Sequence, residues 1–311
     1  MTTNIYYNPK NSLTLYEIEK HLDFLMKLYT LNKLPKVLML SGKKGIGKST
    51  LVNHFLNFVY DKDEYDIKKK KINKESSFNK KYLNNSFSNI IYLSGDDFKN
   101  VKVEDIRDLK KQLLKTTILN KERFIILDDV ELFNLNSLNA LLKIIEEPTE
   151  NNYFVLINNK TRNLIDTIYS RSLEVKISLT NMMREKIIES LINNFSLKVS
   201  IDYQNIKISP GNFLIFNEIM NDNNLNINDD YLASFKKILV LYKKNKDINL
   251  INLALLFTDN YFSKLKENST SNIDLIFNNK SYVIDNINKF VNFNLNQNSL
   301  ISAINSKLTN E

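Results

Sequence analysis

The chain has 311 residues, more than one ordinary α/β domain needs, and this length predicts about two or three domains. It holds no cysteine and only two histidines, His21 and His54, which excludes disulfides and thiolate metal sites and makes a histidine-based metal site implausible. The formal net charge of +8 is compatible with a nucleic-acid partner but does not establish one.

The sequence shows neither a secretory signal nor a membrane-spanning segment. The N-terminal stretch MTTNIYYNPK lacks the charged and then apolar layout of a secretory signal. No apolar run in the chain is long enough to span a bilayer. We therefore expect a cytoplasmic protein.

A glycine-rich segment occupies residues 41–50, which read SGKKGIGKST. It completes the pattern G-x-x-x-x-G-K-[ST] of the phosphate-binding loop, in which backbone N–H groups converge on a di- or triphosphate. In this pattern Lys48 reaches the outer phosphates and the Ser49 hydroxyl binds Mg²⁺. The loop residues that we expect to bind nucleotide are Gly42, Gly45, Gly47, Lys48, Ser49 and Thr50. The alternative is a glycine turn that only joins a strand to a helix.

The surroundings of this segment favour the phosphate loop. The apolar run from Val37 to Leu40 before it predicts a buried parallel strand. After Lys48, apolar residues recur at helical spacing and predict a helix whose N-terminus favours anions. These apolar residues are Leu51, Val52, Phe55, Leu56 and Val59.

Apolar runs alternate with helical patterns over the first 180 residues, which is typical of an α/β domain with a parallel sheet covered by helices. The predicted strands run from Val37 to Leu40, Ile90 to Leu93, Phe124 to Leu127, Tyr153 to Ile157 and Leu173 to Ile177. After about Thr180 the strand pattern stops, and helical segments follow.

Residues 61–89, between the first two predicted strands, are rich in Lys, Asn and Ser and include the run from Lys68 to Lys71. We interpret this insert as a mobile surface loop, because so polar a segment offers little apolar surface to bury. An arm that contacts DNA is the alternative.

Polar side chains follow the third and fourth predicted strands. Asp128 and Asp129 end the third strand, and Asp128 is expected to hold Mg²⁺ through its water shell. Asn158 and Asn159 follow the fourth, where either amide could sense a γ-phosphate or could serve only as a turn former. The expected nucleotide site therefore includes Asp128, Asp129 and Asn158, with Ser49 and Asp128 as Mg²⁺ ligands.

Arg171 stands between two serines, just before the last predicted strand. In an oligomeric ATPase such an arginine can project into the site of the neighbouring subunit and stabilise transition-state charge. The alternative is a solvated surface arginine.

The motifs converge on a family. The run ILDDVELFNLNSLNALLKIIEEPTENNYFVLINNKTRNLIDTIYSRS resembles the bacterial clamp-loader AAA+ subunits, whose signature is N-A-L-L-K-x-x-E-E-P followed by a strand and T-I-x-S-R-C. Here the two parts are Asn139 to Pro148 and Thr167 to Ser172. The resemblance implies an AAA+ P-loop domain at residues 1–180, a helical lid at 181–226 and an all-α collar domain at 227–311.

Departures from the family pattern favour a subunit that is not itself the motor. At the position of Asp129, members of the AAA+ class use a glutamate to orient the attacking water. The aspartate in this chain is one methylene shorter. A shift of about 1 Å in a group that positions water can cost on the order of 10²-fold in the rate of hydrolysis. The lid motif S-P-G-R reads Ser209-Pro210-Gly211-Asn212, and no arginine follows Arg184. The chain also ends after one collar-sized segment, without a Pro-rich extension.

Two further departures concern zinc and the finger motif. Family members commonly carry a four-cysteine zinc module after the phosphate loop, so we expect no zinc site here, and the 61–89 insert occupies that place. The S-R-C motif reads S-R-S, which leaves Arg171 in position.

The resemblance implies a stator-like clamp-loader subunit that presents Arg171 to the adjacent motor and binds ATP or ADP with Mg²⁺ as a structural ligand. Its implied partners are the gamma/tau motor and delta subunits, and indirectly the sliding clamp and primed DNA. One alternative is a gamma/tau-type ATPase that hydrolyses ATP itself, and another is an AAA+ interaction module without a role in replication. We expect no polymerase chemistry, because nothing in the sequence supplies a paired-metal carboxylate site.

Overall fold

The computed structural model describes residues 8–95, 101–114, 121–268 and 273–309. The chain divides into two compact units, which we describe separately. The first consists of Met1–Ser190 together with Ser209–Asn212, and the second of Leu191–Ile208 together with Phe213–Glu311. The predicted boundary between a lid at 181–226 and a collar at 227–311 stays a prediction.

A five-stranded sheet forms the centre of the first unit, and all of its neighbouring strands pair in parallel. Its strands are β1 (Val37–Ser41), β2 (Ile90–Ser94), β3 (Arg123–Asp128), β4 (Asn152–Asn158) and β5 (Leu173–Lys176). They follow the order β2-β3-β4-β1-β5, which places the ends of β1, β3 and β4 at one edge of the sheet. All five predicted strands are confirmed, with small differences at their ends.

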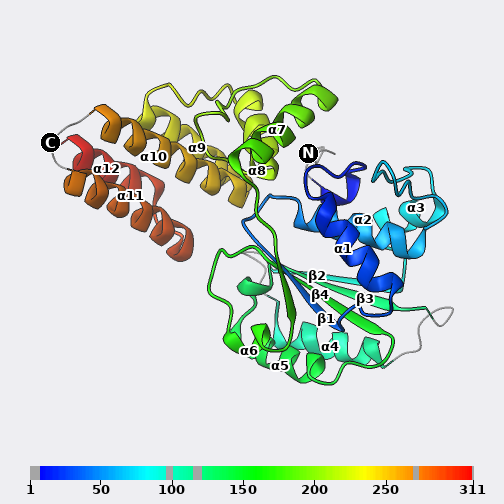
Figure 1. Ribbon diagram of the computed structural model, residues 1–311. Helices are drawn as coiled ribbons and strands as arrows, with labels where there is room; N and C mark the ends of the chain where they lie inside the picture. The colour runs from blue at the N-terminus through cyan, green and yellow to red at the C-terminus, as the bar shows by residue number, and fades with distance from the viewer. Residues whose placement is uncertain (1–7, 96–100, 115–120, 269–272, 310–311) are drawn as a thin grey trace. The chain divides into compact units, whose positions relative to one another are not determined.

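Helices cover both faces of this sheet (Figure 1). On one face lie α1 (Glu19–Thr30), α2 (Lys48–Tyr60) and α3 (Ser77–Leu83), and on the other lie α4 (Val103–Leu113), α5 (Leu135–Ile145) and α6 (Asp166–Tyr169). Alternate residues of β3 enter the two cores, because successive side chains of a strand point to opposite faces. Phe124 packs edge-to-face on Phe55 of α2, whereas Ile125 belongs to the core cluster that includes Leu141 of α5. The strands β1 and β3 are buried along their whole length, and their sequences are mostly apolar because both of their faces are covered.

The interpretation of residues 61–89 as a mobile loop is wrong. The insert contains α3, and its side chains Tyr65, Phe78 and Tyr82 are each about 95% buried in the core beside α2. Phe78 packs edge-to-face on Phe87, with ring centroids 5.0 Å apart, and close to Tyr60, at 5.4 Å. These aromatic residues lie among lysines and asparagines, so that the average polarity of the segment conceals an apolar face.

Helices make up the described part of the second unit, as predicted. α7 (Asn181–Phe195) belongs to the second unit only from Leu191 onward, and α8 (Pro210–Asp222) only from Phe213 onward. The helices that follow are α9 (Tyr231–Asn245), α10 (Ile248–Asn268), α11 (Ile273–Phe293) and α12 (Gln297–Thr309). Tyr231 of α9 is hydrogen-bonded to Thr258 of α10 at 2.9 Å and stacks on Tyr261, with ring centroids 4.5 Å apart. These contacts join α9 to α10.

No helix within the described ranges combines the length and the apolar character that crossing a bilayer requires.

Candidate functional site

The glycine-rich segment forms a tight loop between β1 and α2. Gly45 and Gly47 have φ angles of +81° and +98°, in the left-handed region that a residue with a Cβ atom rarely adopts. Gly47 is the N-cap residue of α2, and Lys48, Ser49 and Thr50 form its first turn. The loop therefore directs backbone N–H groups and the N-terminus of α2 towards one place, which is the arrangement that binds phosphate.

Lys48 lies inside this loop and is almost fully buried. Its Nζ donates hydrogen bonds of 2.7 Å to the carbonyl oxygens of Gly42 and Lys43. Burial lowers the pKa of Lys48 to about 8, while the nearby carboxylates of Asp128, Glu131 and Asp129 act in the opposite direction. The side chain is thus a buried cation held within the loop, where it can reach a bound anion.

The carboxylate of Asp128 lies at the end of β3, beside the first turn of α2. Its Oδ2 accepts hydrogen bonds from Ser49 Oγ at 3.1 Å and from the Tyr92 hydroxyl at 2.6 Å. Burial raises the pKa of Asp128, whereas the hydrogen bond from Tyr92 acts to lower it. A hydroxyl and a carboxylate oxygen are ligands that Mg²⁺ prefers, so the expected pair Ser49 and Asp128 fits this ion.

Asp129 is also buried, and its carboxylate contacts the side chains of Asn159 and Lys44. Its Oδ1 accepts a hydrogen bond of 2.7 Å from Asn159 Nδ2. The Lys44 ammonium lies 3.3 Å from both carboxylate oxygens. The backbone of Asp129 is left-handed, with φ +50°, an uncommon conformation that aspartate tolerates better than most residues.

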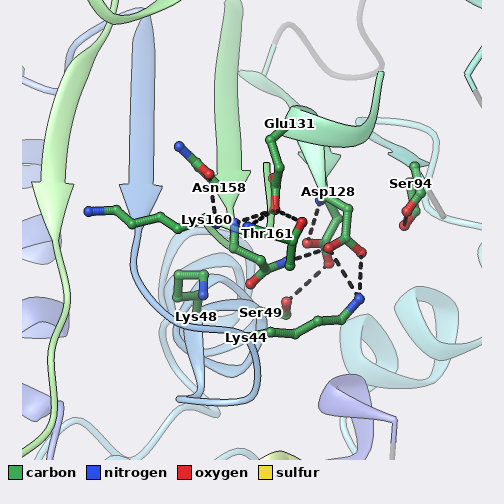
Figure 2. A network of polar contacts seen from close by, with 12 residues as sticks. Lys44, Lys48, Ser49, Ser94, Asp128, Glu131, Asn158, Lys160 and Thr161 are labelled. Atoms are coloured by element: carbon green, nitrogen blue, oxygen red, sulfur yellow. Dashed lines mark hydrogen bonds and ion pairs between the residues drawn. The ribbon is translucent and has the colours of Figure 1, made fainter. Parts of the chain in front are cut away.

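Glu131 forms the second half of this network and was not identified from the sequence. It belongs to the short 3-10 helix η4 (Val130–Leu132) and is 96% buried. Its Oε1 accepts a hydrogen bond from Asn159 N at 3.0 Å. It also accepts from Thr161 Oγ1 at 2.8 Å, and Figure 2 shows Glu131 and Thr161 side by side. Glu131 thereby fixes the backbone that follows β4 against the acidic end of β3.

The two asparagines at the end of β4, Asn158 within the strand and Asn159 directly after it, have different partners. Asn158 donates to the Tyr169 hydroxyl at 3.0 Å, and its Oδ1 accepts from Lys160 N at 2.9 Å. Asn159, by contrast, contacts Asp129. The structure therefore brings Asn159 to the acidic pair, whereas the expected site residue Asn158 is hydrogen-bonded to α6 and to its own turn.

The lid motif Ser209–Asn212 belongs to the first unit and contacts the phosphate loop. Gly211 N donates a hydrogen bond of 2.8 Å to Gly45 O. A Cβ atom on Gly211 would lie 2.9 Å from Gly45 Cα, so only glycine permits this approach. Asn212 Oδ1 lies close to the Cβ position of Gly45, which places an amide beside the loop.

Arg171 follows α6 and contacts a different set of residues. Its Nε donates to Glu146 Oε1 at 2.8 Å, and its Nη1 donates to Thr167 O at 3.1 Å. About a third of the side chain is exposed. None of these partners belongs to the phosphate loop or to the acidic pair, so Arg171 is not part of the polar network around Asp128.

The chain is similar to known DNA polymerase III subunits. The family model described as DNA polymerase III, delta subunit, matches residues 18–181, just over half of the chain. A DNA polymerase III subunit gamma of Buchnera aphidicola subsp. Schizaphis graminum is 28% identical over 214 residues, which cover 64% of this chain and 56% of the relative. A subunit delta' of Bacillus subtilis is 22% identical over 68% of this chain and 60% of the relative.

Shorter matches have higher identity. A subunit delta' of Pseudomonas aeruginosa is 34% identical over 76 residues, which cover 24% of this chain and 23% of the relative. Among solved structures, a DNA polymerase III gamma subunit-related protein of Thermotoga maritima is 15% identical, with a TM-score of 0.47 over 91% of this chain and 96% of that one. The chain spans little more than half the length of the first relative named above.

Proposed function

Because the chain belongs to the bacterial clamp-loader AAA+ family, we propose that it is the delta-prime, stator-like subunit of the DNA polymerase III clamp loader. In this role it occupies one end of a ring of AAA+ subunits in the cytoplasm and holds its neighbours through its C-terminal helices. It contributes to ATP hydrolysis in the neighbouring motor subunit without being a motor itself. Its partners are the gamma/tau and delta subunits, and through them the sliding clamp and primed DNA.

One observation carries this proposal, namely that the Asp129 carboxylate is held between Asn159 and Lys44. A group that orients an attacking water must accept a hydrogen bond from that water at about 2.6–3.2 Å. Asp129 is shorter than the glutamate of the motor pattern, and its oxygens already bind an amide and an ammonium. The arrangement supports a carboxylate that stabilises the site and does not activate water.

The retained phosphate loop supports nucleotide binding as a separate property. Lys48 and the loop N–H groups would hold the phosphates, and Ser49 and Asp128 would hold the accompanying Mg²⁺. Mg²⁺, when bound, neutralises phosphate charge. We include Asn159 beside Asn158 as a candidate for the residue that responds to the terminal phosphate, because Asn159 contacts the acidic pair.

Arg171 is the residue through which this subunit would act on its neighbour. Its side chain is partly exposed and its planar fork suits bidentate contact with phosphate oxygens. The residue lies outside the phosphate-loop network of its own chain, which supports a role in trans.

The test uses the complex reconstituted with the gamma/tau and delta subunits. Replacing Arg171 with Ala should leave assembly intact and lower the ATPase rate of the complex, because one motor site loses its finger. Arg162→Ala, which removes another exposed arginine of the same unit, is the matched control and should keep the full rate. An unchanged rate with Arg171→Ala would remove the finger role, and failure of the chain to bind either partner would remove the clamp-loader assignment.

The second candidate function is a gamma/tau-type ATPase. Lys48, Ser49 and Asp128 are in place for it, and the gamma subunit of Buchnera is similar over 64% of the chain. Asp129 and Asn212, at the positions of a catalytic glutamate and a sensing arginine, argue against it.

A further inference from the structure

The guanidinium of Arg171 is held on two sides by its own subunit. Glu146, which follows the last turn of α5, accepts from Nε at 2.8 Å, and Nη2 lies 2.5 Å from the same oxygen. On the other side, Nη1 donates to Thr167 O at 3.1 Å and to Ser170 Oγ at 3.3 Å. A flexible side chain at the surface thus has a defined direction.

These contacts use particular edges of the guanidinium. Glu146 occupies the edge formed by Nε and Nη2. Ser170 Oγ donates to Thr167 O at 3.1 Å, so the two acceptors of Nη1 lie beside one another. A guanidinium has five N–H groups in a rigid fork. End-on binding of two phosphate oxygens would use the terminal N–H groups of Nη1 and Nη2, away from the Nε edge that Glu146 occupies.

We infer that Glu146 is a positioning residue for Arg171: it holds the Nε edge so that the terminal pair of N–H groups points to the phosphate of the neighbouring subunit. This inference rests on the proposed finger role of Arg171. Glu146 itself touches no nucleotide in this account, and its effect passes entirely through the guanidinium.

The ion pair between Arg171 and Glu146 can orient the Arg171 side chain, but it adds little to the stability of the fold. The side chains of Arg171 and Glu146 are 34% and 45% exposed. Ion pairs exposed to this extent add little to folding free energy, because water and salt screen them. Arginine, however, has many rotamers, and fixing one of them before assembly lowers the entropy lost when the finger meets its phosphate.

The experiment compares variants of this subunit in the reconstituted clamp-loader complex, with kcat and KM for ATP as readouts. Glu146→Ala should lose about half or more of the rate that Arg171→Ala loses, with KM unchanged, because a misdirected group weakens only the transition state. Glu146→Gln should recover part of the rate, since its amide oxygen still accepts from Nε. The neighbouring Glu147→Gln is the matched control, because Glu147 is exposed and follows directly in the chain.

The thermal midpoint of the subunit and its incorporation into the complex should be the same for all of these variants. Adding Glu146→Ala to Arg171→Ala should cause no further loss, because both changes act through one group. A full or increased rate with Glu146→Ala, or a further loss in the double variant, overturns the positioning role while the finger role stands. A full rate with Arg171→Ala overturns both.

Discussion

Asn159 Nδ2 donates a hydrogen bond of 2.7 Å to Asp129 Oδ1, which joins the residue after β4 to the acidic end of β3. Lys44 reaches the same carboxylate from the phosphate loop, at 3.3 Å. Three segments that are distant in sequence therefore meet at one buried aspartate. The contacts of Asp129 connect the loop that would bind phosphate with the end of β4 that would sense it. They also engage the carboxylate at the position where a motor subunit needs a free base.

Nucleotide binding should depend on Lys48. In the wild-type chain, ADP or ATP with Mg²⁺ should raise the thermal midpoint, since a ligand at 100 times its Kd stabilises the folded state by about 2.7 kcal/mol. Lys48→Ala should abolish this increase because it removes the buried cation of the loop. Lys43→Ala, an exposed lysine of the same loop, is the control and should keep it. An equal increase in both variants would show that the nucleotide binds elsewhere.

Chelation of Mg²⁺ by EDTA should reduce the stabilisation by ATP in the wild-type chain. Ser49→Ala should reduce the effect of Mg²⁺ while leaving part of the effect of the nucleotide, because the loop N–H groups remain. A stabilisation that is insensitive to both changes would argue against Ser49 as a ligand.

The insert at residues 61–89 should be part of the folded core. Phe78 is 95% buried and packs against Tyr60 and Phe87, so Phe78→Ala should lower the free energy of unfolding by about 3–5 kcal/mol. Lys69→Ala, an exposed change in the lysine run of the same insert, should leave it within about 0.5 kcal/mol of the wild-type value. Denaturant unfolding of both variants measures this difference. If the Phe78→Ala protein has wild-type stability, the insert is a surface loop and not part of the folded core.

His54 should make the first unit sensitive to acid. The ring is buried in α2 beside Tyr65, with Nδ1 2.9 Å from the Tyr65 hydroxyl, and burial lowers the pKa of His54 to about 4. The unfolded chain, with a histidine pKa near 6.5, therefore binds more protons between pH 6.5 and pH 4. Stability is full above pH 6.5 and falls as the pH decreases, by up to about 3 kcal/mol from this group.

Thermal midpoints at pH 7 and pH 5 test this sensitivity. His54→Phe keeps an aromatic side chain at this position and removes the titration, so its midpoint should decrease less than that of the wild-type chain between these two pH values. An equal decrease in both proteins would assign the acid sensitivity to other groups.

The sheet could be predicted from the sequence because strands buried on both faces are mostly apolar, as in Val37–Ser41 and Arg123–Asp128. The phosphate loop could be predicted because its geometry demands glycine at positions with positive φ. The partners of Asp129 could not be predicted, since they depend on which side chain after β4 faces β3, and adjacent residues face in opposite directions.

Glu131 and Tyr92, two site residues that were not predicted, have no local sequence pattern that marks them. Glu131 acts from a single 3-10 turn, and nothing in its neighbourhood marks it as buried. Tyr92 reaches Asp128 only because β2 and β3 are paired in the sheet, which places Ser94 opposite Asp128. Both depend on contacts between segments that are distant in the sequence.

Nucleotide binding and turnover, measured on the same isolated chain, test the central claim most directly. Equilibrium titration with ATP and Mg²⁺ should give binding, while phosphate release under the same conditions should stay far below the rate of a motor subunit. This result is expected because Asp129 is bound to Asn159 and Lys44. Turnover at a rate typical of a motor, abolished by Asp129→Ala, would contradict the stator account.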